Sequence, residues 1–201
     1  MLKLYQSLLS GNAYKIRLLL SALERPYERV TLNLGAGEAR TPEMLARNPL
    51  GRIPILELDD GRTLFESNAI LTYLAEGSAF YPSDNWLRAK IMQWLMFEQY
   101  DLVRPLARVR FLISIAKQKD KFEAHIAELQ EMGRKALGHL DRHLADEDYL
   151  VGGVYSIADM SLYAYTHLAE EGEYDLGAYP AVRRWIARVE AQPSYVPMII
   201  D

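Results

Sequence analysis

Short apolar runs alternate with turn residues along the first half of the chain. The pattern predicts strands at residues 2–5 and 27–34. Between them, apolar residues recur at the spacing of one helix face, at Ile16, Leu19, Leu20 and Leu23. Pro26 ends this helix. The chain therefore begins with a strand, a helix and a second strand.

The next segment adds a short helix, a hairpin and a further helix. Thr41 and Pro42 supply an N-cap and a first helical residue for a helix that ends at about residue 47. Strands at 54–58 and 62–66 flank an Asp-Gly turn, which is the signal of a hairpin. Ser67 is predicted to cap a helix over 68–76. The order β-α-β-α-β-β-α predicts a small mixed sheet with helices packed on it.

After residue 84 the strand signals end and long helical patterns follow. Helices are predicted over 85–117, 121–144, 156–170 and 180–192. The first has an apolar face made of Leu87, Ile91, Leu95, Leu102, Val109 and Ile113. Pro105 is expected to kink it. We therefore predict an α/β domain over 1–77, a linker up to residue 84, and an all-α domain over 85–201.

Composition narrows the class of function. The formal net charge of -4 gives no basic field for a phosphate backbone, so we expect neither nucleic acid nor membrane as a partner. No segment approaches the length of a membrane span and no secretory leader is evident, so a cytoplasmic location is expected. The chain has no cysteine, so any sulfur nucleophile must come from a ligand.

Three segments together resemble the glutathione transferase superfamily: SGNAYKIRLLL, NPLGRIPILELDDGRTLFESNAILTYL and SIADMSLYAY. The resemblance spans essentially the whole chain and is closest to serine-dependent bacterial and theta-like members. It implies a thioredoxin-like glutathione-binding domain followed by an all-helical domain that contributes the site for an electrophile. It also implies glutathione as a co-substrate, no further cofactor, and a homodimer.

The resemblance assigns the cysteinyl and γ-glutamyl units of glutathione to two dipeptides. Ile53 would pair its main chain with the cysteinyl unit, with a cis peptide bond before Pro54, in the manner of strand addition. The alternative is an ordinary trans proline that begins a strand. Glu66 and Ser67 would bind the γ-glutamyl group at a helix N-terminus, and the alternatives are a solvated charge and a helix cap.

Ser10 lies at the turn between the first strand and the first helix, where matching family members place the hydroxyl that stabilises the glutathione thiolate. From residue type and position alone it is equally a helix cap. Tyr5 is the rival, because other branches use a tyrosine late in this strand. Asn12 is a third local donor. Arg52 is our candidate for the glycyl carboxylate, and Arg40 is a second candidate.

In the second domain, one face of the first long helix carries aromatic and basic residues. This face is our candidate wall of the electrophile site, to which Tyr5 could also contribute, and the alternative is a dimer contact. The candidate wall comprises Met96, Phe97, Tyr100, Arg104, Arg108 and Phe111. The run from Ser156 to Asp159 is predicted to be a structural capping box. His139 and His143 share a helix face without a third ligand, so no metal is expected.

These observations lead to one principal hypothesis and two alternatives. The principal hypothesis is conjugation, in which the glutathione thiolate attacks a small hydrophobic electrophile while Ser10 stabilises the thiolate. The first alternative is a glutathione-dependent peroxidase or disulfide reductase that uses the same site. The second is a binding protein that retains the glutathione fold without turnover.

Overall fold

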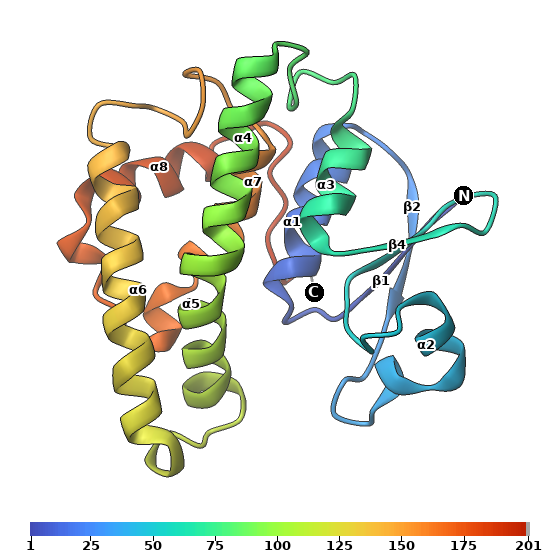
Figure 1. The fold of residues 1–201 in the computed structure, drawn as a ribbon, viewed down its shortest axis with the longest axis horizontal. Coiled ribbons are helices and arrows are strands. Elements are labelled where there is room, and N and C mark those ends of the chain that lie inside the picture. Colours follow the sequence, from blue (N-terminus) through green and yellow to red (C-terminus); the bar gives the residue numbers. More distant parts are fainter. Residues whose placement is uncertain (200–201) are drawn as a thin grey trace. The chain divides into compact units, whose positions relative to one another are not determined.

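The computed structural model describes residues 1–199, and the chain divides into two compact units (Figure 1). The first unit comprises residues 1–78 together with the tail that starts at Pro193, and the second comprises residues 79–192. The tail was expected in the helical domain. Side-chain contacts to the first helix, described below, place it in the first unit instead.

The elements of the first unit follow the predicted order. They are β1 (Leu2–Gln6), α1 (Gly11–Ala22), β2 (Tyr27–Thr31), α2 (Pro42–Arg47), β3 (Ile55–Glu57), β4 (Thr63–Phe65) and α3 (Ser67–Ala75), with a 3-10 turn at Glu38–Arg40. The sheet order is β2-β1-β3-β4, in which β1 and β2 are parallel and the other pairs are antiparallel. The prediction of a thioredoxin-like mixed sheet is confirmed.

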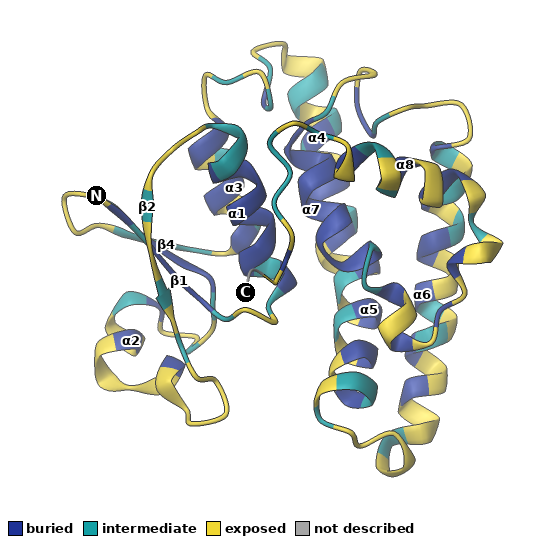
Figure 2. Ribbon diagram, turned by 180° about the vertical axis from the view of Figure 1, so that it is seen from behind, coloured by how far each residue is buried: buried dark blue, intermediate teal, exposed yellow. Residues whose placement is uncertain are grey.

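Strand register decides which residues share a face of the sheet. Tyr5 of β1 lies opposite Val30 of β2 and Ile55 of β3. These residues form a cluster with Met44 of α2. Residues of the opposite parity, such as the fully buried Leu4, face the side on which α1 and α3 lie (Figures 1 and 2). The sheet is therefore covered by α1 and α3 on one face and by α2 on the other.

Both ends of α1 are defined by local hydrogen bonds. At its start, the Ser10 hydroxyl accepts a hydrogen bond from the Ala13 amide at 3.2 Å. At its end, Glu24 adopts a left-handed conformation with φ +49°. The amide of Arg25 then donates to the Leu20 carbonyl at 2.9 Å, in the manner of a Schellman motif. The turn that follows α1 therefore has a fixed conformation.

The tail is fastened along α1 by three side chains of that helix. The Tyr14 hydroxyl donates to the Val196 carbonyl at 2.7 Å, and the Ser21 hydroxyl donates to the Ser194 carbonyl at 2.8 Å. Between them, Arg17 donates through Nη2 to the Met198 carbonyl. Residues 14, 17 and 21 recur at helical spacing, so one stripe of α1 holds the tail.

Two predictions about the first unit are wrong. The strand predicted to reach residue 34 ends at Thr31, because the Asn33 amide donates to the Glu38 carboxylate at 2.6 Å and a loop follows. Ser67 does not cap α3. The N-cap is Glu66, and the Ser67 hydroxyl donates to Asn12 Oδ1 at 3.3 Å instead. This bond between Ser67 and Asn12 connects the N-termini of α1 and α3.

The second unit is helical throughout its main elements. They are α4 (Asn85–Phe97), α5 (Val103–Arg110), α6 (Glu123–His143), α7 (Ile157–Thr166) and α8 (Pro180–Glu190). The helix predicted over 85–117 is interrupted by π-helical turns at Glu98–Leu102 and Phe111–Ile115. The first turn ends three residues before Pro105, which has no N–H for the carbonyl of Asp101. The kink expected at Pro105 stays a prediction, and neither π-helical turn was predicted.

The centre of the second unit contains the predicted capping box. Ser156 is the N-cap of α7, and both reciprocal bonds of the box to Asp159 are present. The buried Asp159 carboxylate also accepts from the Leu150 amide and from Trp185 Nε1, each at 2.9 Å. It therefore joins the loop before α7 to α7 and α8.

Candidate functional site

The first unit contains a pocket of about 600 Å³ next to the start of α1. It brings together four residues that the sequence singled out, namely Ser10, Arg40, Arg52 and Ile53. The remaining lining residues belong to the loops before α2 and before β3: Leu34, Gly35, Gly37, Ala39 and Gly51. The volume lies in the range of small-molecule sites.

Ser10 is half-buried at the head of α1 and lines this pocket. Its oxygen accepts a hydrogen bond from the Ala13 amide, so the helix-cap interpretation is confirmed. A hydroxyl that accepts retains its own hydrogen for donation. The cap and a donor role toward a ligand in the pocket are therefore compatible, and the N-terminus of the 12-residue helix adds a favourable field for an anion.

The buried side chain of Asn48 fixes the conformation of the segment before β3. The expected cis peptide bond joins Ile53 and Pro54. Asn48 is almost fully buried, and its Nδ2 donates to the Arg52 carbonyl at 2.8 Å while its Oδ1 accepts from the Leu50 amide at 3.0 Å. The strand ladder starts only at Ile55, so the main chain of Ile53 lies outside it, at the pocket.

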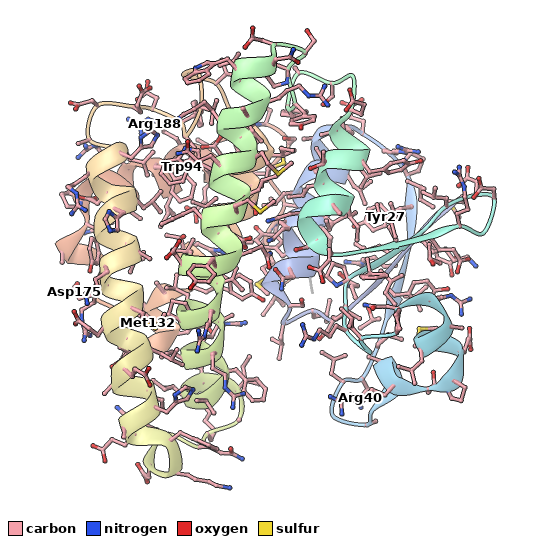
Figure 3. The ribbon with its side chains drawn as sticks, viewed as in Figure 1. Tyr27, Arg40, Trp94, Met132, Asp175 and Arg188 are labelled. Carbon is pink, nitrogen blue, oxygen red and sulfur yellow. The ribbon has the colours of Figure 1, made fainter. Side chains whose placement is uncertain are left out.

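Two arginines give the pocket a positive potential. Arg40 and Arg52 are both exposed, and neither forms an ion pair with any residue in the range 1–199. Gly51 has φ +59°, and a Cβ at this position would lie 3.0 Å from Cγ of Arg40. A side chain at Gly51 would thus displace Arg40, whose place ahead of α2 is marked in Figure 3. Two cations without acidic partners suit a ligand carboxylate.

Asn12, Glu66 and Ser67 lie at the N-termini of α1 and α3. The bond from the Ser67 hydroxyl to Asn12 brings these two helix ends together. Glu66 is exposed and has φ +67° and ψ 110°, a conformation that L-amino acids rarely adopt. Unusual backbone of this kind is concentrated at ligand-binding positions. These three residues do not line the 600 Å³ pocket itself.

The structure directs the Tyr5 side chain to the face of the sheet covered by α2. Its hydroxyl donates to Oε2 of Glu57 at 2.9 Å, and Arg47 lies over its ring at 5.2 Å. Burial raises the pKa of Tyr5, and the bond to Glu57 raises it further. Glu57 also accepts from Arg47, which lowers the pKa of this carboxyl to about 2. The Tyr5 hydroxyl is therefore engaged away from Ser10.

Phe97 has surroundings different from those of the other candidate electrophile residues of the second unit. Phe97 packs edge-on against Trp94 at 5.3 Å and lines a 460 Å³ pocket toward α6. Arg108 instead lies over the ring of Phe111 at 5.4 Å. Met96, Tyr100, Arg104, Arg108 and Phe111 are all exposed. Sequence spacing placed Phe97 with this group, and its packing against Trp94 separates it.

Two features of the pocket were not predicted from the sequence. Asn48 follows the end of α2 and had no predicted role, yet it fixes the loop that carries Arg52. An asparagine before a proline was the available signal, since such residues bond to nearby backbone. The glycine-rich loop at residues 34–37 was predicted partly as strand, and it forms one side of the pocket.

The fold and the pocket have counterparts in a known family. The glutathione S-transferase N-terminal domain matches residues 1–76 and the C-terminal domain of that family matches residues 102–193. The chain belongs to the glutathione S-transferase family. Its fold of a mixed sheet with helices followed by a helical unit is the fold of that family.

Relatives and solved structures agree with this assignment. A glutathione S-transferase from Pseudomonas fluorescens is 44% identical, with a TM-score of 0.97 and 99% of each chain covered. Disulfide-bond oxidoreductase YfcG of Escherichia coli is 31% identical over 91% of this chain and 87% of that protein. A glutathione transferase from Burkholderia graminis, solved with two glutathione molecules bound per subunit, is 28% identical, with a TM-score of 0.85 and coverage of 96% and 85%.

The described part of the chain offers neither a membrane span nor a cluster of metal ligands. Within residues 1–199, no helix has the length and apolar character needed to cross a membrane. The same residues contain no group of three or more histidine, aspartate or glutamate side chains arranged to hold a metal ion. His143 bonds to the Leu150 carbonyl at 2.9 Å, and His139 lies 2.8 Å from Arg142.

Proposed function

We propose that this protein is a glutathione transferase that joins the glutathione thiolate to small hydrophobic electrophiles, with Ser10 stabilising the thiolate. The observation that carries the proposal is the pocket that unites Ser10, Ile53, Arg40 and Arg52. It offers a hydroxyl at a helix N-terminus, main-chain groups and two cations within one small volume. Glutathione is a peptide thiol with two carboxylates, and it needs all three features.

The pocket accounts for the cysteinyl and glycyl parts of glutathione. Ile53 lies outside the strand ladder, so its main chain can pair with the cysteinyl unit. Arg52 or Arg40 then neutralises the glycyl carboxylate. Asn48 holds the carbonyl of Arg52 in place. The loop before β3 would therefore bind the ligand without rearrangement.

The ends of α1 and α3 account for the γ-glutamyl part. Its carboxylate would accept from the first amides of α3 and from the Ser67 region, where the helix field favours an anion. The exposed carboxylate of Glu66 would face the ammonium group. Asn12, already bonded to Ser67, would orient this end of the ligand.

The chemical step needs a thiolate that the chain cannot supply itself, because it has no cysteine. A free thiol has a pKa of about 8.5, and lowering it by about two units, or about 2.7 kcal/mol, makes the thiolate the main species at neutral pH. One well-placed donor contributes an amount of this order. The Ser10 hydroxyl would donate to sulfur while its oxygen continues to accept from Ala13.

A second candidate function is glutathione-dependent disulfide reduction at the same site. It is favoured by the similarity to the Escherichia coli disulfide-bond oxidoreductase. In that reaction the glutathione thiolate attacks one sulfur of a disulfide and the other sulfur leaves as a thiolate. One new mixed disulfide forms for each disulfide broken. The same Ser10 would stabilise the attacking sulfur in either reaction.

Activity assays separate these functions. The purified protein is tested with glutathione and, in turn, a chromogenic aryl halide, an organic hydroperoxide and a small mixed disulfide. Conjugation of the aryl halide at a rate that falls in Ser10→Ala supports the proposal. Turnover of the disulfide alone would favour the second candidate. Glutathione binding with no turnover of any substrate would identify a binding protein instead.

Binding of glutathione is tested separately by calorimetry. Arg52→Gln removes a cation from the pocket and is expected to weaken glutathione binding about 10-fold or more, as for a lost charged hydrogen bond. Arg62→Gln is the matched control, because Arg62 is equally exposed but bonds to Asp60 on the hairpin. Equal affinities of the two variants would contradict the assignment of Arg52.

A further inference from the structure

Arg17 of α1 is a buried cation with unused hydrogen-bond donors. Its side chain is only 2% exposed, and Nη2 donates to the Met198 carbonyl. Its Nε and Nη1 have no hydrogen-bond partner among the described residues. Nε carries one N–H and Nη1 carries two. Leaving such donors unpaired in the interior of a protein is costly, so the site is suited to an acceptor.

No carboxylate of the described chain neutralises this guanidinium. Its charge is stacked on the Tyr14 ring at 5.1 Å, and its pKa is lowered by burial. The hydroxyl of Tyr14 is itself used by the tail, through the Val196 carbonyl. Tyr14 and the tail therefore fix the position of the Arg17 side chain, but they supply no negative charge to neutralise it.

Arg17 lines a second pocket of the first unit, with a volume of about 470 Å³. The pocket lies between the end of α1, the turn into β2 and the tail. Its lining also includes Leu20, Ser21, Glu24, Arg25, Pro26, Tyr27 and Val196. None of these residues lines the 600 Å³ pocket of the proposed glutathione site. The 600 Å³ pocket lies at the N-cap of α1, Ser10, whereas the second pocket is lined by residues of the helix itself.

The charged, polar and apolar groups that line this pocket indicate the kind of ligand that it would bind. Arg17 and Arg25 provide two cations, and Tyr27, which Figure 3 marks on β2, provides a hydroxyl. Glu24 provides one negative charge and disfavours a ligand with several. Leu20, Pro26, Val196 and the Tyr27 ring are apolar. A ligand with one carboxylate and an apolar body matches this combination.

We propose that the Arg17 pocket binds a small monoanionic carboxylate with an apolar body, whose carboxylate is attracted by the uncompensated charge of the Arg17 guanidinium. Arg25 lies at the rim and adds a second attraction. The Schellman turn fixes the backbone of Glu24 and Arg25 beside the pocket. The apolar body would lie against the tail at Val196. This site is independent of the proposed transferase function.

The probe is 4-fluorobenzoate, followed by fluorine NMR in the intact protein at constant ionic strength. We expect saturable binding that the neutral isostere 4-fluorobenzamide does not reproduce. Arg25→Gln should weaken it about 3- to 10-fold and Glu24→Gln should tighten it about 3-fold, as for partly exposed charges. Arg17→Gln should abolish it. If Arg17→Gln does not fold, Arg25→Gln and Glu24→Gln still test the proposal.

Two control variants locate the binding. Arg62→Gln changes the same net charge on an exposed residue of the hairpin outside the pocket, and should leave the affinity unchanged. Arg52→Gln should also leave it unchanged, which excludes binding at the glutathione site. The proposal is overturned if 4-fluorobenzoate does not saturate, if the benzamide binds equally, or if inorganic phosphate displaces it at lower concentration. An effect of Arg52→Gln larger than that of Arg25→Gln would likewise overturn it.

Discussion

Two hydroxyl groups near the start of the chain, those of Tyr5 and Ser10, were the candidates for stabilising a bound thiolate. The Tyr5 hydroxyl donates to Glu57 beneath α2, whereas Ser10 lines the pocket at the head of α1. Ser10→Ala is therefore expected to lower the conjugation rate about 10- to 1000-fold, as loss of one donor to a developing anion does. Tyr5→Phe should lower the rate by much less, and affinity for glutathione should change little in either variant.

The deciding measurement is the ultraviolet absorbance of bound thiolate against pH. The pKa of bound glutathione should rise in Ser10→Ala and stay unchanged in Tyr5→Phe. Because Tyr5→Phe removes a hydrogen bond to a charged group, it should instead destabilise the chain by about 1–3 kcal/mol. A raised thiol pKa in Tyr5→Phe with an unchanged one in Ser10→Ala would reverse the assignment.

The buried Asp159 carboxyl makes stability depend on pH. Burial raises its pKa to about 6, whereas an unfolded chain has a pKa of about 3.9. Between these values the folded state binds more protons, so this group's contribution to stability falls as pH rises through 6. The free energy lost in Asp159→Asn should therefore shrink by up to about 3 kcal/mol between pH 4 and pH 8. Urea unfolding at several pH values measures this change.

His167 of the second unit provides a control of opposite sign. Burial lowers its pKa to about 4, below the unfolded value of about 6.5. The unfolded state binds more protons in this window, so stability is lost as pH falls from 6.5 toward 4. The free energy lost in His167→Gln should thus shrink on acidification. Parallel pH trends in the two variants would contradict the environments described for both groups.

Helix α6 contains two glycines that differ in their surroundings. A Cβ at Gly133 would lie 2.4 Å from the Tyr174 hydroxyl oxygen and 2.6 Å from its ring, whereas at Gly138 the nearest atom is Arg142 Nη1 at 3.6 Å. Alanine favours a helix over glycine by about 1 kcal/mol. Gly138→Ala should therefore stabilise the chain by about 0.5–1 kcal/mol. Gly133→Ala should destabilise it by about 1–3 kcal/mol because of overpacking.

Thermal and urea unfolding of the two glycine variants check this prediction. Tyr174→Phe combined with Gly133→Ala removes the closest of the clashing atoms and should recover part of the loss. Equal stabilisation by Gly133→Ala and Gly138→Ala would show that Tyr174 moves aside without cost.

The elements that the sequence predicted well are those with a local cause. Ser10, Thr41 and Ser156 bond to amides two or three residues ahead, and Pro42 begins α2 as expected. The errors have causes distant in sequence. Ser67 bonds to Asn12, 55 residues away, and therefore does not cap α3 as predicted. The π-helical turn at Phe111–Ile115 has no proline or glycine to announce it.

The residues of the candidate site were likewise predicted only in part. The resemblance identified Ser10, Arg52 and Ile53, and these three residues line one pocket. The loop residues 34–37 and Asn48 were not assigned, because their contribution depends on how the loops fold over the end of the sheet. The direction of the Tyr5 side chain required the strand register, which places it with Ile55 on the α2 face.

At the scale of the whole molecule we expect a homodimer, as the resemblance implies. The second unit exposes large apolar side chains along α4 and its π-helical turn, including Trp86 at 71% and Tyr100 at 78%. Sedimentation equilibrium at micromolar concentration should give twice the chain mass of 23.0 kDa. Met96→Glu, at another exposed position of α4, should weaken association. A monomeric mass for the unsubstituted protein would refute this expectation.

The tail along α1 has a consequence for how the two units are connected. The chain passes from the first unit to the second near residue 78 and returns near residue 193, so the helical unit is an insertion within the first. A single proteolytic cut in the 77–84 segment would leave the units joined through the second crossing. The fragments would stay associated for as long as the tail keeps its bonds to Tyr14, Arg17 and Ser21.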